Sequence, residues 1–185
     1  MSDEGICDED AALADAKLGR SAAFSILVRA HQASVFSLAL RVLGDRESAR
    51  DVAQESFLQL YRKLASIESA RHLKFWLRRV SVNLAIDKLR QQPKVEFSKF
   101  DENVDLPATI ANDDPLLQRQ LLTFVLELAP APRAVMLLKY QEDLDQTEIA
   151  AALDMSINTV KSHLRRSLQV VREKALAANH WMEAK

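Results

Sequence analysis

Residues 145–176, DQTEIAAALDMSINTVKSHLRRSLQVVREKAL, contain two helical patterns joined by a tight turn. Asp145 followed by Glu148 is a capping-box-like pair, with Asp in place of the usual Ser or Thr, and predicts that a helix begins there. Asp154 stands near the position where many such turns place Gly in a left-handed conformation, which Asp adopts at some cost. Ser156 can cap the second helix by accepting hydrogen bonds from free backbone N–H groups.

Both predicted helices are amphipathic, with apolar residues at helical spacing. The side chains expected to be buried are Ile149, Ala150 and Leu153 in the first helix and Ile157, Val160, Leu164 and Leu168 in the second. Two short helices packed around a tight turn form a helix-turn-helix.

The opposite face of the second helix is polar and basic. Asn and Arg side chains can form paired hydrogen bonds with base edges, while Lys and Ser suit phosphates. The residues expected to contact DNA are Asn158, Lys161, Ser162 and Arg165 in one stripe, with Thr159 and Arg166 beside it. A solvated amphipathic helix in a bundle is the alternative. Two capped helices, with small Ala150 where they must approach closely, favour DNA binding.

The composition predicts an all-helical chain. Only three Gly and five Pro occur among 185 residues, and 48% of the residues are hydrophobic. No run of about 18 apolar residues is present, and the acidic N-terminus does not have the order of a signal peptide. One cysteine, Cys7, fits a reducing compartment, so a cytoplasmic protein is expected.

Charge and periodicity divide the chain. An acidic N-terminal tail is expected over 1–20 and a helical domain over 21–92, which holds 12 basic and 6 acidic residues. Residues 93–115 hold 2 basic and 6 acidic residues, show no sustained period, and are expected to be a linker. A second helical domain is expected over 116–176 and a C-terminal tail over 177–185. The basic parts indicate a polyanionic partner, or solvated helix faces if charge alone is considered.

Three stretches together resemble one protein family. They are DRESARDVAQESFLQLYRKL (45–64), FWLRRVSVNLAIDKLRQQ (75–92) and the helix-turn-helix with the residues that precede it. In this order and spacing they resemble the extracytoplasmic-function group of bacterial sigma factors, over about residues 20–176. The resemblance implies a protein that joins RNA polymerase core, reads the −35 and −10 promoter elements and opens the duplex. It also implies two small helical domains and a flexible linker.

The resemblance implies a polymerase-binding face on the helix expected over 47–64. Asp51, Gln54 and Glu55 match the family's contact with the clamp helices of the largest polymerase subunit, and acidic and amide groups suit a basic partner helix. Alternatively, the two acidic residues only pair with Arg50 or Arg62. The second domain is implied to bind the flap of the second-largest subunit.

The helix expected over 75–91 matches the −10 reader of the family. Asn83 matches the family's Asn, whose amide can bond an extruded base, and the loop 66–73 would form the base pocket. Phe75 and Trp76 can stack on bases or belong to the core, and the core is favoured for Trp76. The basic residues implied to hold the DNA strand are Arg71, Lys74, Arg78, Arg79, Lys88 and Arg90.

Three residues depart from the family's pattern. Arg50 stands where an acidic residue is common, Val82 replaces a frequent polar or basic residue, and His163 replaces a frequent Arg. The first bears on polymerase or regulator contacts, and the other two bear on promoter preference.

Members of this group are commonly held inactive by an anti-sigma factor, often membrane-anchored, and such a partner is expected here. The alternative function is a helix-turn-helix regulator of another class, but no strand-like runs indicate the receiver domain that such regulators carry. The four histidines lack metal-ligand spacing, and neither a phosphate loop nor a nucleophile–base pair is visible, so no cofactor or enzyme activity is indicated.

Overall fold

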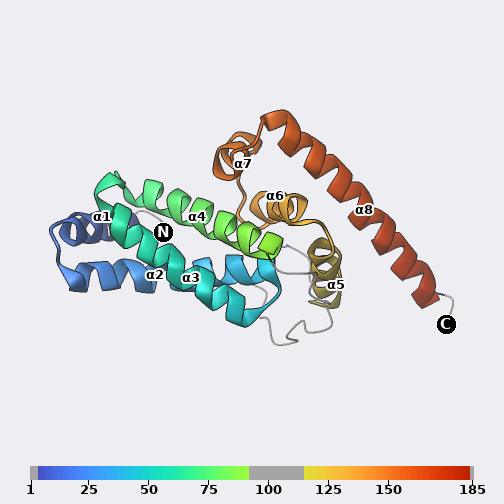
Figure 1. Cartoon of the computed structure of the whole chain (residues 1–185). Helices are drawn as coiled ribbons and strands as arrows, with labels where there is room; N and C mark the ends of the chain where they lie inside the picture. The colour runs from blue at the N-terminus through green and yellow to red at the C-terminus, as the bar shows by residue number, and fades with distance from the viewer. Residues whose placement is uncertain (1–3, 92–114, 184–185) are drawn as a thin grey trace.

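The computed structural model describes residues 4–91 and 115–183, and all of these residues lie in helices or the short connections between them. The first part contains four α-helices and one 3-10 turn (Figure 1). They are α1 (Glu4–Lys17), α2 (Ser21–Leu43), α3 (Arg46–Lys63), η1 (Leu64–Ser66) and α4 (Ala70–Gln91). The predicted linker, including Glu96, Asp101, Glu102 and Asp105, lies outside the described residues.

The turn between α2 and α3 has a local cause in the dipeptide Gly44–Asp45. Gly44 ends α2 in the left-handed region at φ 76°, which glycine adopts without steric cost. Asp45 then caps α3, because its carboxylate accepts a hydrogen bond from the Ser48 N–H at 2.7 Å. That bond holds the pKa of Asp45 below its usual value.

The N-terminal segment differs from the expected tail, because α1 packs against α2, α4 and η1. Ala12, Leu13 and Ala16 of α1 are buried in one core with residues of α2, α3 and α4. In addition, Asp10 Oδ1 accepts a hydrogen bond from the Ala70 N–H at 2.6 Å. This contact supplies an acceptor at the start of α4, which therefore begins five residues before the expected Phe75.

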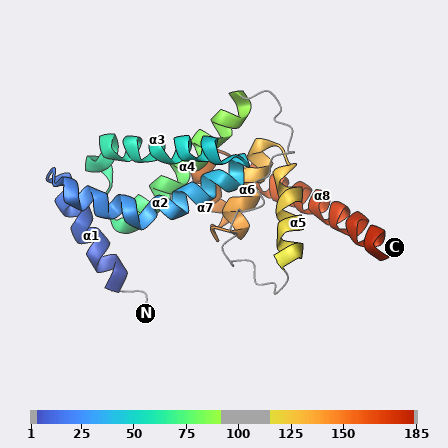
Figure 2. The same cartoon turned by 90° about the horizontal axis from the view of Figure 1, so that it is seen from below.

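The second part contains four more helices: α5 (Pro115–Leu126), α6 (Pro130–Tyr140), α7 (Gln146–Leu153) and α8 (Ile157–Glu183). Both views show α6 and α7 beside α2 and α4, whereas the C-terminal end of α8 extends beyond the other helices (Figures 1 and 2). The all-α fold in two helical regions is the one that the sequence predicts.

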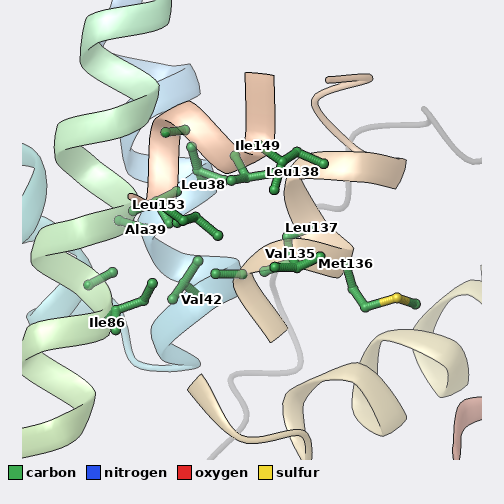
Figure 3. Packing of buried hydrophobic residues seen from close by; sticks show 14 of the residues in the cluster. Leu38, Ala39, Val42, Ile86, Val135, Met136, Leu137, Leu138, Ile149 and Leu153 are labelled. Carbon is green, nitrogen blue, oxygen red and sulfur yellow. The ribbon is translucent and has the colours of Figure 1, made fainter. Parts of the chain in front are cut away.

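A second core joins the two regions. Leu38 and Val42 of α2 and Ile86 of α4 belong to the same buried cluster as Leu138 of α6 and Leu153 of α7 (Figure 3). The two regions therefore share buried apolar surface.

Helix α2 is the one described helix that is long and apolar enough to cross a membrane by length and composition. Leu27, Val35, Leu38 and Val42 are nonetheless buried against neighbouring helices. Core packing accounts for this apolar composition.

Candidate nucleic-acid interface

The helix-turn-helix is built by α7 and α8 through local capping. The Asp145 carboxylate accepts hydrogen bonds from the N–H groups of Thr147 and Glu148, and Glu148 Oε2 accepts one from the Asp145 N–H, so the predicted capping box is confirmed. Asp154 ends α7 in the left-handed region at φ 51°, also as predicted. Ser156 Oγ accepts from the Thr159 N–H at 3.0 Å and caps α8.

The buried stripe of α8 is rotated from the predicted one. Val160 and Leu164 are buried as expected, but Ile157 and Leu168 are exposed, at 41% and 44%. The stripe continues instead through Ser167 and Val171, because positions 160, 164, 167 and 171 follow the helical repeat of four and three residues. The prediction gave too much weight to leucine and isoleucine and missed a buried serine.

The rotation leaves the polar face of α8 open. All six predicted DNA-contacting residues are exposed: Asn158, Thr159, Lys161, Ser162, Arg165 and Arg166. The Thr159 hydroxyl lies 2.8 Å from Ser156 Oγ and thus belongs to the cap. The arrangement presents amide, hydroxyl and cationic groups together on one side of the second helix of a helix-turn-helix, as groove binding requires.

The basic residues of α4 divide into two groups. Arg71, Lys74, Arg79 and Arg90 are exposed. Arg90 pairs with Asp87 at 3.4 Å, whereas the other three have no ion-pair partner within the described part of the chain. Their cationic groups are accessible to a polyanion. Lys88 is half-buried, and its Nζ lies 2.7 Å from Asp51 Oδ2. Asp51 therefore pairs with a residue of α4 and not with Arg50.

Arg78 and Asn83 face the second region. Asn83 is half-buried, and its Nδ2 donates a hydrogen bond to the backbone carbonyl of Ala152 in α7 at 3.0 Å. Arg78 Nε lies 2.6 Å from Glu142 Oε2, as an ion pair without an aligned hydrogen bond. Two predicted −10 residues thus contact the second region.

Glu142 and Arg41 are interface residues that the sequence reasoning missed. Glu142 Oε1 accepts a hydrogen bond from Arg41 Nη2 at 3.3 Å, so its carboxylate lies between Arg41 and Arg78. Burial lowers the pKa of Arg41, and the charge of Glu142 opposes that shift. The available signal was the position of Arg41 inside the apolar run LALRVL, where a cation needs a partner.

The predicted polymerase-binding residues lie along α3. Asp51 and Gln54 are exposed and Glu55 is half-buried. Glu55 Oε1 accepts a hydrogen bond from Gln59 Nε2 at 3.1 Å and lies 3.9 Å from Arg62 Nη1. The pair with Arg62 is the local alternative that the sequence left open, and an exposed ion pair of this kind contributes only about 0.2–1 kcal/mol.

The fold and these surfaces define a helical DNA-binding protein: a helix-turn-helix with an open polar face, and a separate basic helix in the preceding region. Family comparison specifies it further. Residues 27–95 match Sigma-70 region 2, and residues 118–170 match Sigma-70 region 4. The chain belongs to the sigma-70 family, in its extracytoplasmic-function group.

Relatives and solved structures agree with this assignment. RNA polymerase sigma-E factor of Streptomyces coelicolor is 31% identical over 160 residues, which cover 86% of this chain and 90% of that protein. ECF RNA polymerase sigma factor SigW of Bacillus subtilis is 27% identical over 170 residues, covering 85% and 91%.

Two solved structures share the fold. CnrH, solved with the cytosolic domain of CnrY, has a TM-score of 0.65 at 22% identity, covering 92% of this chain and 98% of that chain. RpoE of Bartonella quintana, solved with the anti-sigma factor NepR, has a TM-score of 0.62 at 18% identity, covering 82% and 96%.

Proposed function

We propose that this protein is an alternative sigma factor that joins RNA polymerase core and directs transcription initiation at promoters with its own −35 and −10 elements. The observation that carries the proposal is that one chain combines a region 2 with an exposed basic α4 and a region 4 with an open helix-turn-helix. A regulator that only binds duplex DNA has no need of the first surface.

The −35 element is assigned to α8. Asn158 and Arg165 have the side chains that can read base edges, and they lie on the exposed face, seven residues apart. Lys161, Ser162 and Arg166 are exposed beside them and would contact phosphates on either side of the groove. The half-buried His163 stands beside this stripe, where the family often has Arg, so we expect it to change promoter preference.

The −10 element is assigned to α4 and the loop before it. The cationic side chains of Arg71, Lys74 and Arg79 would hold the strand backbone. Asn83 would bond the edge of a base that has left the stack. Because Val82 is fully buried, it shapes the pocket only through packing.

The exposed face of α3 is assigned to the binding of core polymerase. Asp51 and Gln54 would contact the clamp helices of the largest subunit, with Glu55 at the edge. Asp51 must then break its ion pair with Lys88 to contact the polymerase. Breaking this pair costs little free energy, because the Asp51 side chain is 64% exposed. Region 4 would contact the flap of the second-largest subunit.

An anti-sigma factor is the expected regulator. The two solved structures of this fold each contain a partner protein, the cytosolic domain of CnrY in one and NepR in the other. A partner of the present chain would cover the polymerase-binding surfaces, and a membrane-anchored partner would connect it to an extracytoplasmic signal.

Run-off transcription tests the proposal. Purified core polymerase would be incubated with a genomic promoter pool and the wild-type protein, Asn83→Ala or Arg165→Ala. Selective transcripts that depend on added protein, and that each substitution reduces, are expected. If the protein binds duplex DNA but neither binds nor redirects core polymerase, it is a helix-turn-helix regulator of another class.

A further inference from the structure

The contact between the two regions is built around one buried carboxylate. Glu142, in the connection between α6 and α7, has a side chain only 7% exposed, and it approaches Arg41 of α2 at 3.3 Å and Arg78 of α4 at 2.6 Å. The Arg41 side chain is 6% exposed and that of Arg78 is 21% exposed. Both ion-pair partners of Glu142 among the described residues lie in the first region, so its charge stabilises the contact between regions.

The same contact occupies the base-reading amide. Asn83 Nδ2 donates to the Ala152 carbonyl at 3.0 Å, so α7 lies where a base edge would have to approach. An amide committed to a backbone carbonyl cannot give the same hydrogen to a base. The cations Arg71, Lys74 and Arg79, by contrast, stay exposed on α4.

Apolar packing surrounds these polar contacts. Leu38, Ala39 and Ile86 of the first region lie in one buried cluster with Ile149 and Leu153 of α7 (Figure 3). Domains joined by a small polar contact move freely, whereas a shared apolar core favours one arrangement. The contact is therefore a defined state of the molecule.

We propose that this arrangement is a closed, self-inhibited state, in which region 4 covers Asn83 and Arg78 while the phosphate-binding cations of α4 remain free. In the closed state the protein can bind the phosphate backbone of a nucleic acid, but Asn83 cannot read the −10 base until α7 separates from α4. The effect of this closed state on transcription rests on the proposed function, whereas the existence of the closed state does not.

Glu142→Gln is the perturbation that isolates this contact. The substitution preserves the size of the side chain and removes the charge that Arg41 and Arg78 share. The buried guanidinium group of Arg41 and the half-buried one of Arg78 then lose their carboxylate, and separation of the regions lets water solvate them. Arg41→Gln removes the α2 partner of Glu142 in the first region and serves as a second variant if Glu142→Gln folds poorly.

Glu127→Gln is the matched control. It removes the same charge from region 4, but Glu127 pairs with Lys174 inside that region. Far-UV circular dichroism would establish that each variant is folded.

Distances between spin labels report closure directly. In the full chain with Cys7→Ser, labels on cysteines at the exposed positions 32 in α2 and 172 in α8 would be measured by double electron–electron resonance. A single narrow distance distribution is expected for the wild type and for Glu127→Gln, and an added long component for Glu142→Gln and Arg41→Gln. A broad distribution in the wild type overturns the closed state, and an unchanged narrow one in both interface variants overturns the role of Glu142 in holding it.

Run-off transcription at limiting protein then tests inhibition. If only about one molecule in ten is open, opening lowers the protein concentration for half-maximal transcription by up to about tenfold. Variants that open but require the same concentration as wild type show that closure does not inhibit. Absence of transcripts with every variant refutes the sigma function and with it the inhibition, while the label distances still decide whether the closed state exists.

Discussion

Arg133 of α6 is buried at 3% exposure and joins three segments through backbone carbonyls. Its Nη1 donates to the Val42 carbonyl at 2.6 Å, and its Nη2 donates to the carbonyls of Leu126 and Leu128. Val42 and Leu126 lie in the last turns of α2 and α5, where free carbonyls and the helix dipole favour a cation. We predict that Arg133→Met destabilises the protein substantially.

The magnitude follows from two opposing effects. Hydrogen bonds from a charged donor contribute about 1.5–3 kcal/mol each, so three of them contribute roughly 4.5–9 kcal/mol. Burial lowers the pKa of Arg133 from its ordinary value to about 10, which corresponds to a cost of about 3 kcal/mol for the charged form. The variant no longer carries that cost, so the expected net loss of unfolding free energy is about 1.5–6 kcal/mol.

Urea unfolding followed by circular dichroism measures this loss, and the midpoint of thermal unfolding should fall by roughly 5–15 °C. Arg133→Lys is the matched variant: it keeps the charge but cannot reach three carbonyls together, so an intermediate loss is expected. A Met variant as stable as the wild type would contradict this prediction, because it would show that burying the charge costs as much free energy as its hydrogen bonds contribute.

Three further changes test smaller features. Asp154→Gly should raise the unfolding free energy by about 0.5–1 kcal/mol in urea titrations, because glycine adopts φ 51° without a Cβ clash. Asp45→Ala should cost about 1 kcal/mol at pH 7 through loss of the α3 cap. Because the folded pKa of Asp45 is lowered, this contribution is present above the unfolded pKa near 3.8 and lost as pH falls through the folded value, so wild type and variant should converge in acid. Burial lowers the pKa of His31; the nearby charge of Glu9 opposes this shift, and the positive charges of Lys74 and Arg78 add to it. The unfolded state therefore binds a proton at higher pH than the folded state does. The free energy of unfolding should fall as pH drops below about 6.5. A pH series of thermal melts with His31→Gln, in which this part of the slope should vanish, checks it.

The features that sequence reasoning located are those with local causes. The capping box of Asp145 and Glu148, the left-handed Asp154 and the Ser156 cap each depend on residues within three positions of one another. Such signals survive in any tertiary context, since the hydrogen bonds close within a single turn. The exposed polar face of α8 was also predicted correctly, because it depends on the spacing of residues within one helix.

Periodicity located helices more reliably than it located their buried sides. Ile157 and Leu168 fit an apolar stripe in the sequence, yet Ser167 is 2% exposed and Leu168 is 44% exposed. Neighbouring stripes on a helix differ by a rotation of only some tens of degrees, and the helices that pack against α8 choose between them. The hydrophobicity of the residues alone therefore does not predict which stripe of α8 is buried.

Short-range patterns in the sequence are sufficient to predict the all-helical class, the helix-turn-helix and the family motifs. Three contacts depend instead on how distant helices pack: Asp10 of α1 accepts a hydrogen bond at the start of α4, Glu142 pairs with Arg41 and Arg78, and Asn83 donates a hydrogen bond to the Ala152 carbonyl. The partners in these hydrogen bonds stand 60 to 101 residues apart in the sequence. Long-range pairing depends on how whole helices pack, so the availability of Asn83 to DNA is a property of the fold and not of its motif.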